Sequence, residues 1–198
     1  LQAGTSHYLG QNFAKAFDVT FQTEDNKEQL VYATSWGVST RLIGALIMVH
    51  GDDKGLRLPP KVAPTQVVIV PIMRKDSNPD DILKYIHNLE ESLRENNIRF
   101  NVDMREKLSP GHKFNEWEMK GVPIRIEVGP RDMENEELVI CRRDNNTKET
   151  VSIHDSATKA IQLLDEIQDN LFNQAKTFMD EHTTTVSTWD TFKQNINN

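Results

Sequence analysis

From residue 66 to residue 178, the spacing of the apolar residues switches repeatedly between two and a value near 3.6. A period of two is typical of a strand, and a period near 3.6 is typical of a helix. The switching predicts the order strand, helix, strand, helix, strand, hairpin, helix. Because that order is typical of a mixed sheet covered by helices, we predict an α/β domain over this part of the chain.

Local signals place the individual elements. Asn78 can cap a helix that starts at Pro79, and Ser109-Pro110 opens a second helix that Gly121 closes. The strands are predicted at 67–72, 98–104 and 122–128, and the hairpin at 138–142 and 150–153. The first helix carries the apolar stripe Ile82, Ile86, Leu89 and Leu93. The last helix begins at Asp155 or Ser156, and its predicted buried side holds Ala157, Ile161, Leu164, Leu171, Ala175 and Phe178.

The first 53 residues follow a different pattern. We predict strands at 16–21 and 30–36, and a helix from Arg41 to about Val49 that Ser39 or Thr40 caps. The prolines of KGLRLPPKVAP, residues 54–64, favour an extended connector. The predicted domains are therefore an α+β part at 1–60, an α/β domain at 61–182 and a further segment at 183–198.

Composition narrows the possible classes of protein. The apolar runs are far shorter than the ~20 residues that a membrane span needs, so we expect no membrane insertion. The single cysteine, Cys141, excludes an intrachain disulfide framework and a Cys-rich zinc site, and a reducing cytoplasmic setting is expected. A net charge of −7 argues mildly against nucleic-acid binding, although a few local basic residues suffice for recognition. The carboxylates of Asp52 and Asp53 lack a second ligand cluster, so we predict a helix end there and no metal site.

Polar residues near the N-terminus form one candidate site. The stretch from Gln2 to His7 can present hydrogen-bonding side chains to a small ligand, or it is an ordinary loop. Ser35-Trp36-Gly37 and Arg41 join a strand end to a helix start. An arginine there can meet phosphate or stack on a base, and the alternative is an ordinary surface arginine.

Charged residues around the strand at 122–128 form a second candidate site: Glu118, Lys120, Arg125, Arg131 and Arg142. A glutamate accepts hydrogen bonds from the ring NH and amino group of guanine, and an arginine donates to O6 and N7. Trp117 either stacks on a base or belongs to the core. Arg125 and Glu127 are expected on the strand face opposite the apolar residues, where charged side chains are usually solvated.

Three long stretches resemble one family, in the order in which that family carries them. They are TSHYLGQNFAKAFDVTF at 5–21, TSWGVSTRLIGALIMVHGDDKGLRLPPKVAP at 34–64 and SPGHKFNEWEMKGVPIRIEVGPRD at 109–132. All three resemble the class II prolyl-tRNA synthetases of the archaeal and eukaryotic-like type. The resemblance implies ATP-dependent attachment of proline to its tRNA through a prolyl-adenylate, in a cytoplasmic enzyme. It assigns residues 1–60 to the end of the catalytic domain and 61–182 to the anticodon-binding domain.

The resemblance also implies roles for single residues. Arg41 matches the catalytic arginine of the third class II motif, which packs on the adenine side of ATP, and Gln2 and Thr40 match other positions that hold ATP. The positions that match the pocket for proline and the terminal adenosine of the tRNA are Thr5, His7, Ser35 and Trp36. The positions that match readers of the anticodon guanines are Glu118, Arg125, Arg131 and Asp132, although lysine is also common in the family at the position of Arg131.

Other expectations follow from the same resemblance. The first two class II motifs and the zinc-associated C-terminal domain of the family do not match anything in these 198 residues, so we expect an internal piece that does not aminoacylate alone. The full enzyme is expected to use Mg²⁺ with ATP and to form a homodimer, with proline tRNA and proline as partners and no DNA. Three alternatives are a standalone anticodon-domain protein that binds RNA without catalysis, a class II synthetase for another amino acid such as threonine, and a structural protein.

Overall fold

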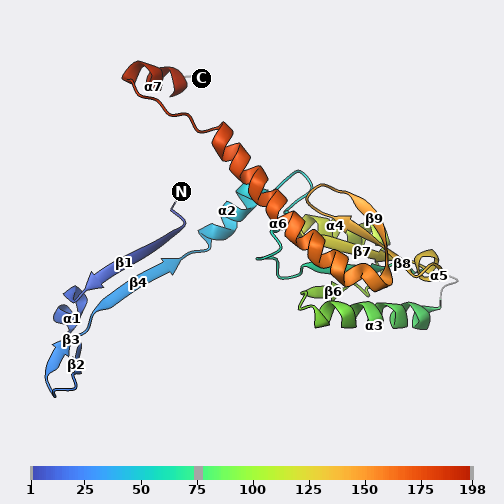
Figure 1. The fold of residues 1–198 in the computed structure, drawn as a ribbon, viewed down its shortest axis with the longest axis horizontal. Coiled ribbons are helices and arrows are strands. Elements are labelled where there is room, and N and C mark those ends of the chain that lie inside the picture. The colour runs from blue at the N-terminus through green and yellow to red at the C-terminus, as the bar shows by residue number, and fades with distance from the viewer. Residues whose placement is uncertain (1, 74–77, 197–198) are drawn as a thin grey trace. The chain divides into compact units, whose positions relative to one another are not determined.

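The computed structural model describes residues 2–73 and 78–196. Figure 1 shows the order of the elements along the chain. The chain divides into two compact units, Leu1–Val49 and His50–Asn198, each of which has its own sheet structure. The predicted domain boundary at residue 60 stays a prediction.

The first unit is built on a two-stranded antiparallel ribbon of β1 (Gly4–Gly10) and β4 (Ala33–Val38). Between these strands the chain forms α1 (Asn12–Phe17) and a small hairpin of β2 (Thr20–Gln22) and β3 (Glu28–Leu30). The helix α2 (Arg41–His50) follows β4, and the Ser39 hydroxyl accepts a hydrogen bond from Arg41 N at 3.4 Å. Ser39 is therefore the one of the two predicted caps whose side chain contacts the helix start.

Two strand predictions in this unit need correction. The predicted strand at 16–21 is wrong over residues 16–19 and right only at residues 20 and 21, because residues 16 and 17 end α1 and Asp18 takes a left-handed conformation with φ of 52°. The amide of Val19 then bonds back to the carbonyl of Ala14 at 2.9 Å, which closes the helix before pairing starts at Thr20. The predicted strand at 30–36 is interrupted at residues 31 and 32, between β3 and β4.

The second unit contains a five-stranded mixed sheet, as predicted. In sheet order its strands are β6 (Phe100–Val102), β5 (Val67–Pro71), β7 (Ile124–Val128), β8 (Glu137–Arg142) and β9 (Lys148–Ser152). β5 is parallel to both of its neighbours, and β8 and β9 continue the sheet as an antiparallel hairpin. All five residues of β5 are buried, so helices and loops cover both faces of this strand. β6 is shorter than predicted because only three of its residues pair with β5 at the sheet edge.

Helices cover the two faces of this sheet. On one face, α3 (Pro79–Glu95) and α6 (Ser156–Glu181) enclose the main core, in which the predicted stripe of α3 is fully buried. On the other face, Phe114 and Trp117 of α4 (Pro110–Met119) pack on Val68, Val70 and Val122. The short helix α5 (Pro130–Glu134) follows β7, the 3-10 turn η1 (Ile153–Asp155) precedes α6, and α7 (Trp189–Ile196) lies near the C-terminus. Among the described residues, no helix has the length and apolar character needed to cross a bilayer.

The buried side of α6 differs in part from the prediction. Ile161 and Phe178 are exposed, and Ala175 is half-buried. The core is contacted by the predicted Ala157, Leu164 and Leu171 and also by residues that were not predicted: Ala160, Leu163 and Ile167. The predicted stripe was therefore displaced around the helix by part of a turn. Several apolar residues of this helix do not contact the core, and the prediction counted some of them as buried.

The connector after α2 packs against the end of α4. Leu56 N donates to the carbonyl of Met119, and Leu58 N donates to the carbonyl of Gly121, both at 3.0 Å. This close approach requires Gly121, whose φ is 76° and whose added Cβ would lie 2.5 Å from the carbonyl oxygen of Leu56. The first residues of the connector therefore lie beside the C-terminal end of α4, where the candidate site begins.

Candidate functional site

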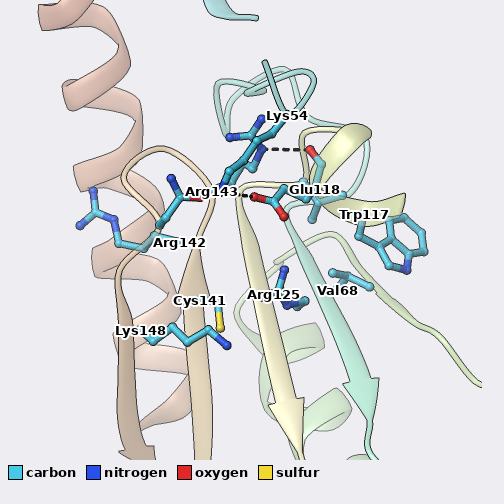
Figure 2. A pocket seen from close by; sticks show the side chains of 11 residues that line it. Lys54, Val68, Trp117, Glu118, Arg125, Cys141, Arg142, Arg143 and Lys148 are labelled. Carbon is cyan, nitrogen blue, oxygen red and sulfur yellow. Dashed lines mark hydrogen bonds and ion pairs between the residues drawn. The ribbon is translucent and has the colours of Figure 1, made fainter. Parts of the chain in front are cut away.

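A polar cavity of about 180 Å³ lies on the α4 side of the sheet in the second unit (Figure 2). Its lining comes from the connector, α4, the strands β5, β7, β8 and β9, and the turn between β8 and β9. The charged and polar members of the lining are Lys54, Glu118, Arg125, Cys141, Arg142, Arg143, Asn146 and Lys148. Such a wall, basic and only in part apolar, suits a polar and negatively charged ligand more than a hydrophobic one.

Glu118 and Arg125, which sequence reasoning singled out, both line this cavity. The turn at Gly121 brings them together, because it reverses the chain between the end of α4 and the start of β7. They do not pair with each other in the described part of the chain. Figure 2 shows Glu118 paired instead with Lys54 of the connector, at 3.2 Å between Oε1 and Nζ.

The guanidinium group of Arg125 is held on two sides. Its Nε and Nη2 donate to Oε1 of Glu127 at 3.1 and 2.9 Å. Its Cζ lies 4.3 Å from the centre of the Phe114 ring, within the range of a cation–π contact. The side chain is 16% exposed, so this arginine belongs to a partly desolvated wall and not to open surface.

Glu127 departs from the expectation that the charged face of this strand is solvated, because the residue is only 8% exposed. The predicted alternation is nevertheless right: Ile124, Ile126 and Val128 enter the main core, and Arg125 and Glu127 face the side of α4. Burial disfavours the charged form of Glu127. Its hydrogen-bond donors outweigh that effect and hold the pKa of the carboxyl below its ordinary value.

Cys141 and Lys148 belong to the same cluster, and sequence reasoning did not assign them to the site. Cys141 Sγ lies 3.1 Å from Oε1 of Glu127, and Lys148 Nζ lies 3.0 Å from the same oxygen. Burial and the neighbouring carboxylate raise the pKa of the Cys141 thiol to about 11. The pairing register of the strands is what brings these residues into the site, because Cys141 lies opposite both Arg125 on β7 and Lys148 on β9.

Arg143 stabilises one wall of the cavity, and sequence reasoning did not assign it to the site either. It is 5% exposed, and its Nη1 and Nη2 bond both oxygens of Asp52 at 2.8 and 2.6 Å. Its Nε donates to the backbone carbonyl of Glu118 at 2.9 Å. The carboxylate of Asp52, predicted to mark a helix end, therefore serves as an anchor for the connector.

The other residues singled out around β7 lie outside the cavity or are engaged elsewhere. Asp132 caps its own helix, because its Oδ2 accepts from Gly129 N at 2.7 Å, and the exposed Arg131 stands next to it on α5. Arg142 bonds Asp144 and Glu166. Trp117 packs on the sheet and donates to Asp103, as the core alternative predicted, while Lys120 Nζ lies 4.5 Å from the centre of its ring.

A second hollow, of about 310 Å³, lies in the first unit beside the ends of β1 and β4. It is lined by Gln2, Thr5 and Arg41 among the residues singled out above, and Arg41 Nη1 donates to the carbonyl of Gln2 at 3.3 Å. Thr40 precedes Arg41 but does not line the hollow. The structure therefore brings Arg41 close to Gln2 and Thr5, although Arg41 lies 39 residues after Gln2 in the sequence.

The four residues assigned to the proline and adenosine pocket do not share one face of the ribbon. His7 lies directly opposite Ser35, and Thr5 lies two residues before His7, so these three project from one face. Trp36 lies opposite Ser6 and projects from the other face, where it is 78% exposed. In the described part of the chain, no three His, Cys, Asp or Glu side chains gather closely enough to hold a metal ion.

Comparison with known proteins agrees with this arrangement. A family model described as an anticodon binding domain matches residues 66–163, which include the cavity wall from α4 to β9. The proline--tRNA ligases of Roseiflexus sp. (strain RS-1) and Rubrobacter xylanophilus are 50% and 51% identical to the chain over 199 and 196 residues. Each alignment covers 99% of this chain and 41% of the relative, so the chain spans about two fifths of the length of these proteins.

A solved structure gives the same result. The crystal structure of prolyl-tRNA synthetase from Cryptosporidium parvum, complexed with L-proline and AMP, matches with a TM-score of 0.82 and 43% identity. The match covers 100% of this chain and 42% of that one. The identity extends over both units, including the ribbon, the connector and the anticodon-type domain, and on this evidence the chain belongs to the prolyl-tRNA synthetase family.

Proposed function

We propose that the second unit recognises the anticodon of proline tRNA at the cavity between α4 and the sheet. The observation that carries the proposal is that Glu118 and Arg125 line one partly desolvated cavity while keeping separate protein partners. A guanine that enters the cavity can donate its ring NH and amino group to Glu118, and it can accept at O6 and N7 from Arg125. Arg131 and Asp132, on α5, then belong to the outer part of the RNA surface.

Ligand entry requires an exchange of partners at Glu118. Lys54 is 57% exposed on its side chain, so its pairing with Glu118 is weak and easily displaced. Once released, its ammonium group is free to meet a phosphate of the RNA backbone. Arg125 needs no such exchange, because Glu127 occupies only one edge of its guanidinium group.

The first unit supplies, in our proposal, part of the site that activates proline. The hollow at Gln2, Thr5 and Arg41 supports the assignment, because an arginine at a strand–helix junction can stack on adenine and offer charge to phosphate. Thr40 adds a hydroxyl beside Arg41, and Thr5, His7 and Ser35 present polar groups from one face of the ribbon. Trp36 would act from the other face.

In the whole enzyme these parts serve one reaction. Proline is activated with ATP, in a reaction expected to use Mg²⁺, and is transferred to its tRNA by a cytoplasmic homodimer. The proposal for this chain is narrower: it holds the third class II motif, and it recognises the anticodon.

The anticodon proposal is tested by RNA binding. We expect the chain to bind the anticodon stem-loop of proline tRNA at least about tenfold more tightly than the same stem-loop with its guanines changed to adenine, since a bidentate base contact is worth ~1–3 kcal/mol. Glu118→Ala and Arg125→Ala should each reduce that preference severalfold. Lys176→Ala, which removes an exposed lysine of α6 paired only within its helix, is the matched control and should leave the preference unchanged. Equal affinity of the unmodified chain for both stem-loops would refute the proposal.

A further inference from the structure

A single carboxylate oxygen organises the wall of the cavity. Oε1 of Glu127 receives hydrogen bonds from Arg125, Cys141 and Lys148, which come from three neighbouring strands. All three donors line the cavity, whereas Glu127 is not part of the lining. Glu127 therefore lies behind the wall and reaches a ligand only through the residues that it holds.

The sheet register explains why these groups meet. Arg125 pairs with Cys141, and Cys141 pairs with Lys148, so the three residues form one row across β7, β8 and β9. Directly opposed residues place their side chains on the same face, and Glu127, two residues after Arg125, shares that face. The row and the glutamate thus converge on the side of the sheet that α4 covers.

The geometry leaves one end of the Arg125 guanidinium available. Nε and one N–H of Nη2 are directed at Glu127, and the Phe114 ring packs on the group 4.3 Å from Cζ. Among the described residues, Nη1 has no protein partner. The free end, formed by Nη1 and the second N–H of Nη2, has the fork shape that fits two adjacent acceptors.

We propose that Glu127 is a positioning residue that fixes the Arg125 guanidinium so that its free end reads the O6 and N7 acceptors of a guanine. This inference rests on the proposed anticodon function. The buried carboxylate also balances one of the two positive charges beside it, which keeps Lys148 and Arg125 close together without strong repulsion. A neutral side chain at position 127 would hold the guanidinium less firmly and would leave both cations uncompensated.

The test compares how much single chemical changes in the RNA reduce its affinity for each variant, and it does not rely on the overall affinity. Removing the carboxylate adds a net positive charge near the cavity, so overall RNA affinity is a poor readout of positioning. We would measure binding of the proline anticodon stem-loop with one guanine at a time replaced by 7-deazaguanine, which lacks the N7 acceptor. A parallel series uses inosine, which lacks the amino group assigned to Glu118.

For the unmodified chain we expect about a tenfold loss of affinity for 7-deazaguanine at one position, in line with loss of a bidentate base contact. In Glu127→Gln that loss should shrink to less than about threefold, while the sensitivity to inosine stays as in the unmodified chain. Glu127→Asp keeps the charge but is one methylene shorter, so it should also lose the sensitivity to 7-deazaguanine. If charge alone mattered, Glu127→Asp would behave like the unmodified chain.

The outcomes separate this inference from the proposed function. Retained sensitivity to 7-deazaguanine in either variant would overturn the positioning role of Glu127 and leave anticodon recognition standing. The same holds if the unmodified chain discriminates guanine from adenine but is not sensitive to 7-deazaguanine. Absence of guanine discrimination in the unmodified chain would overturn both. Thermal unfolding monitored by circular dichroism checks the fold of each variant, and unfolding of both at room temperature would make Glu127 a folding residue and overturn the positioning role.

Discussion

Arg143 shows how one buried side chain can join parts of the chain that are distant in sequence. Its guanidinium group bonds both oxygens of Asp52, just before the connector, and the backbone carbonyl of Glu118 at the end of α4. The hydrogen bond from Arg143 lowers the pKa of Asp52 from 3.8 to about 2. The same contact therefore stabilises the fold and fixes the backbone next to the proposed guanine-binding carboxylate.

The lowered pKa of Asp52 has a definite sign in its effect on stability. Because the folded chain favours the charged carboxylate, the stabilisation is fully present above the unfolded pKa and is lost as the pH falls from about 4 to about 2. We expect Asp52→Asn to lower the free energy of unfolding by about 1 kcal/mol at pH 6, after allowance for the partial exposure of the side chain.

The deficit of Asp52→Asn should shrink at pH 2.5, where the carboxyl of the unmodified chain begins to take up a proton. Urea unfolding at the two pH values measures it. Asp53→Asn is the matched control, because the neighbouring Asp53 is exposed and forms no ion pair in the described part of the chain. A deficit of equal size at both pH values would show that the charge of Asp52 does not contribute.

Among whole elements, the junction of α4 and β7 decides the geometry of the cavity. The helix must end, the chain must reverse, and the connector must pass within hydrogen-bonding distance, all within the few residues around Gly121. A left-handed conformation at a site without space for a Cβ makes glycine necessary at this position. The distance between Glu118 and Arg125 is set by this turn.

We expect Gly121→Ala to destabilise the second unit by at least about 2 kcal/mol, because it combines an unfavourable φ with a clash against the backbone of Leu56. Gly111→Ala, in the first turn of the same helix, has no atom within 4 Å of its added Cβ and serves as the control. That variant should be stabilised by about 0.5 kcal/mol through a less flexible unfolded state. Chemical denaturation measures both, and equal stability of the two variants would contradict the role of the turn.

For the molecule as a whole, the two units differ sharply in how much they bury. Among residues 2–49 only Ala14 is buried, while Tyr8, Phe17, Trp36 and Met48 are all more than two thirds exposed. The second unit contains a continuous core between the sheet, α3 and α6. Burial of apolar surface is the main stabilising contribution, so the units should differ in local stability.

We therefore expect amide hydrogen exchange to be much faster in β1 and β4 than in β5 and β7. Exchange in the first unit should approach that of an unprotected peptide within minutes, and the central strands of the second unit should remain protected for hours or longer. Mass spectrometry of peptides from the 198-residue chain measures both at once. Equal or greater protection of β1 and β4 would show that the ribbon is stabilised by something other than its own core.

Sequence alone was enough for the features that depend on local spacing. The period of the apolar residues predicted the order of strands and helices and the stripe of α3, and the residue types at positions 78 and 79 predicted the cap at Asn78. Each of these features follows from residues that are close together in the sequence. The same reasoning failed where a local conformation interrupts the period, as at Asp18, where a left-handed residue ends α1 inside a predicted strand. It also misplaced Ile161, because several apolar residues of α6 do not face the core.

The candidate site was predictable only in part. Glu118 and Arg125 were found because a turn residue lies between them and because their stretch resembles a known family. The cluster of Cys141 and Lys148 around Glu127 was not, since the register of three strands sets it, and a shift of one residue would move these side chains to the other face. The separation of Trp36 from His7 has the same cause. Sequence determined which elements form, and the tertiary structure alone decided which side chains meet, because strand pairing joins residues whose separation along the chain carries no local signal.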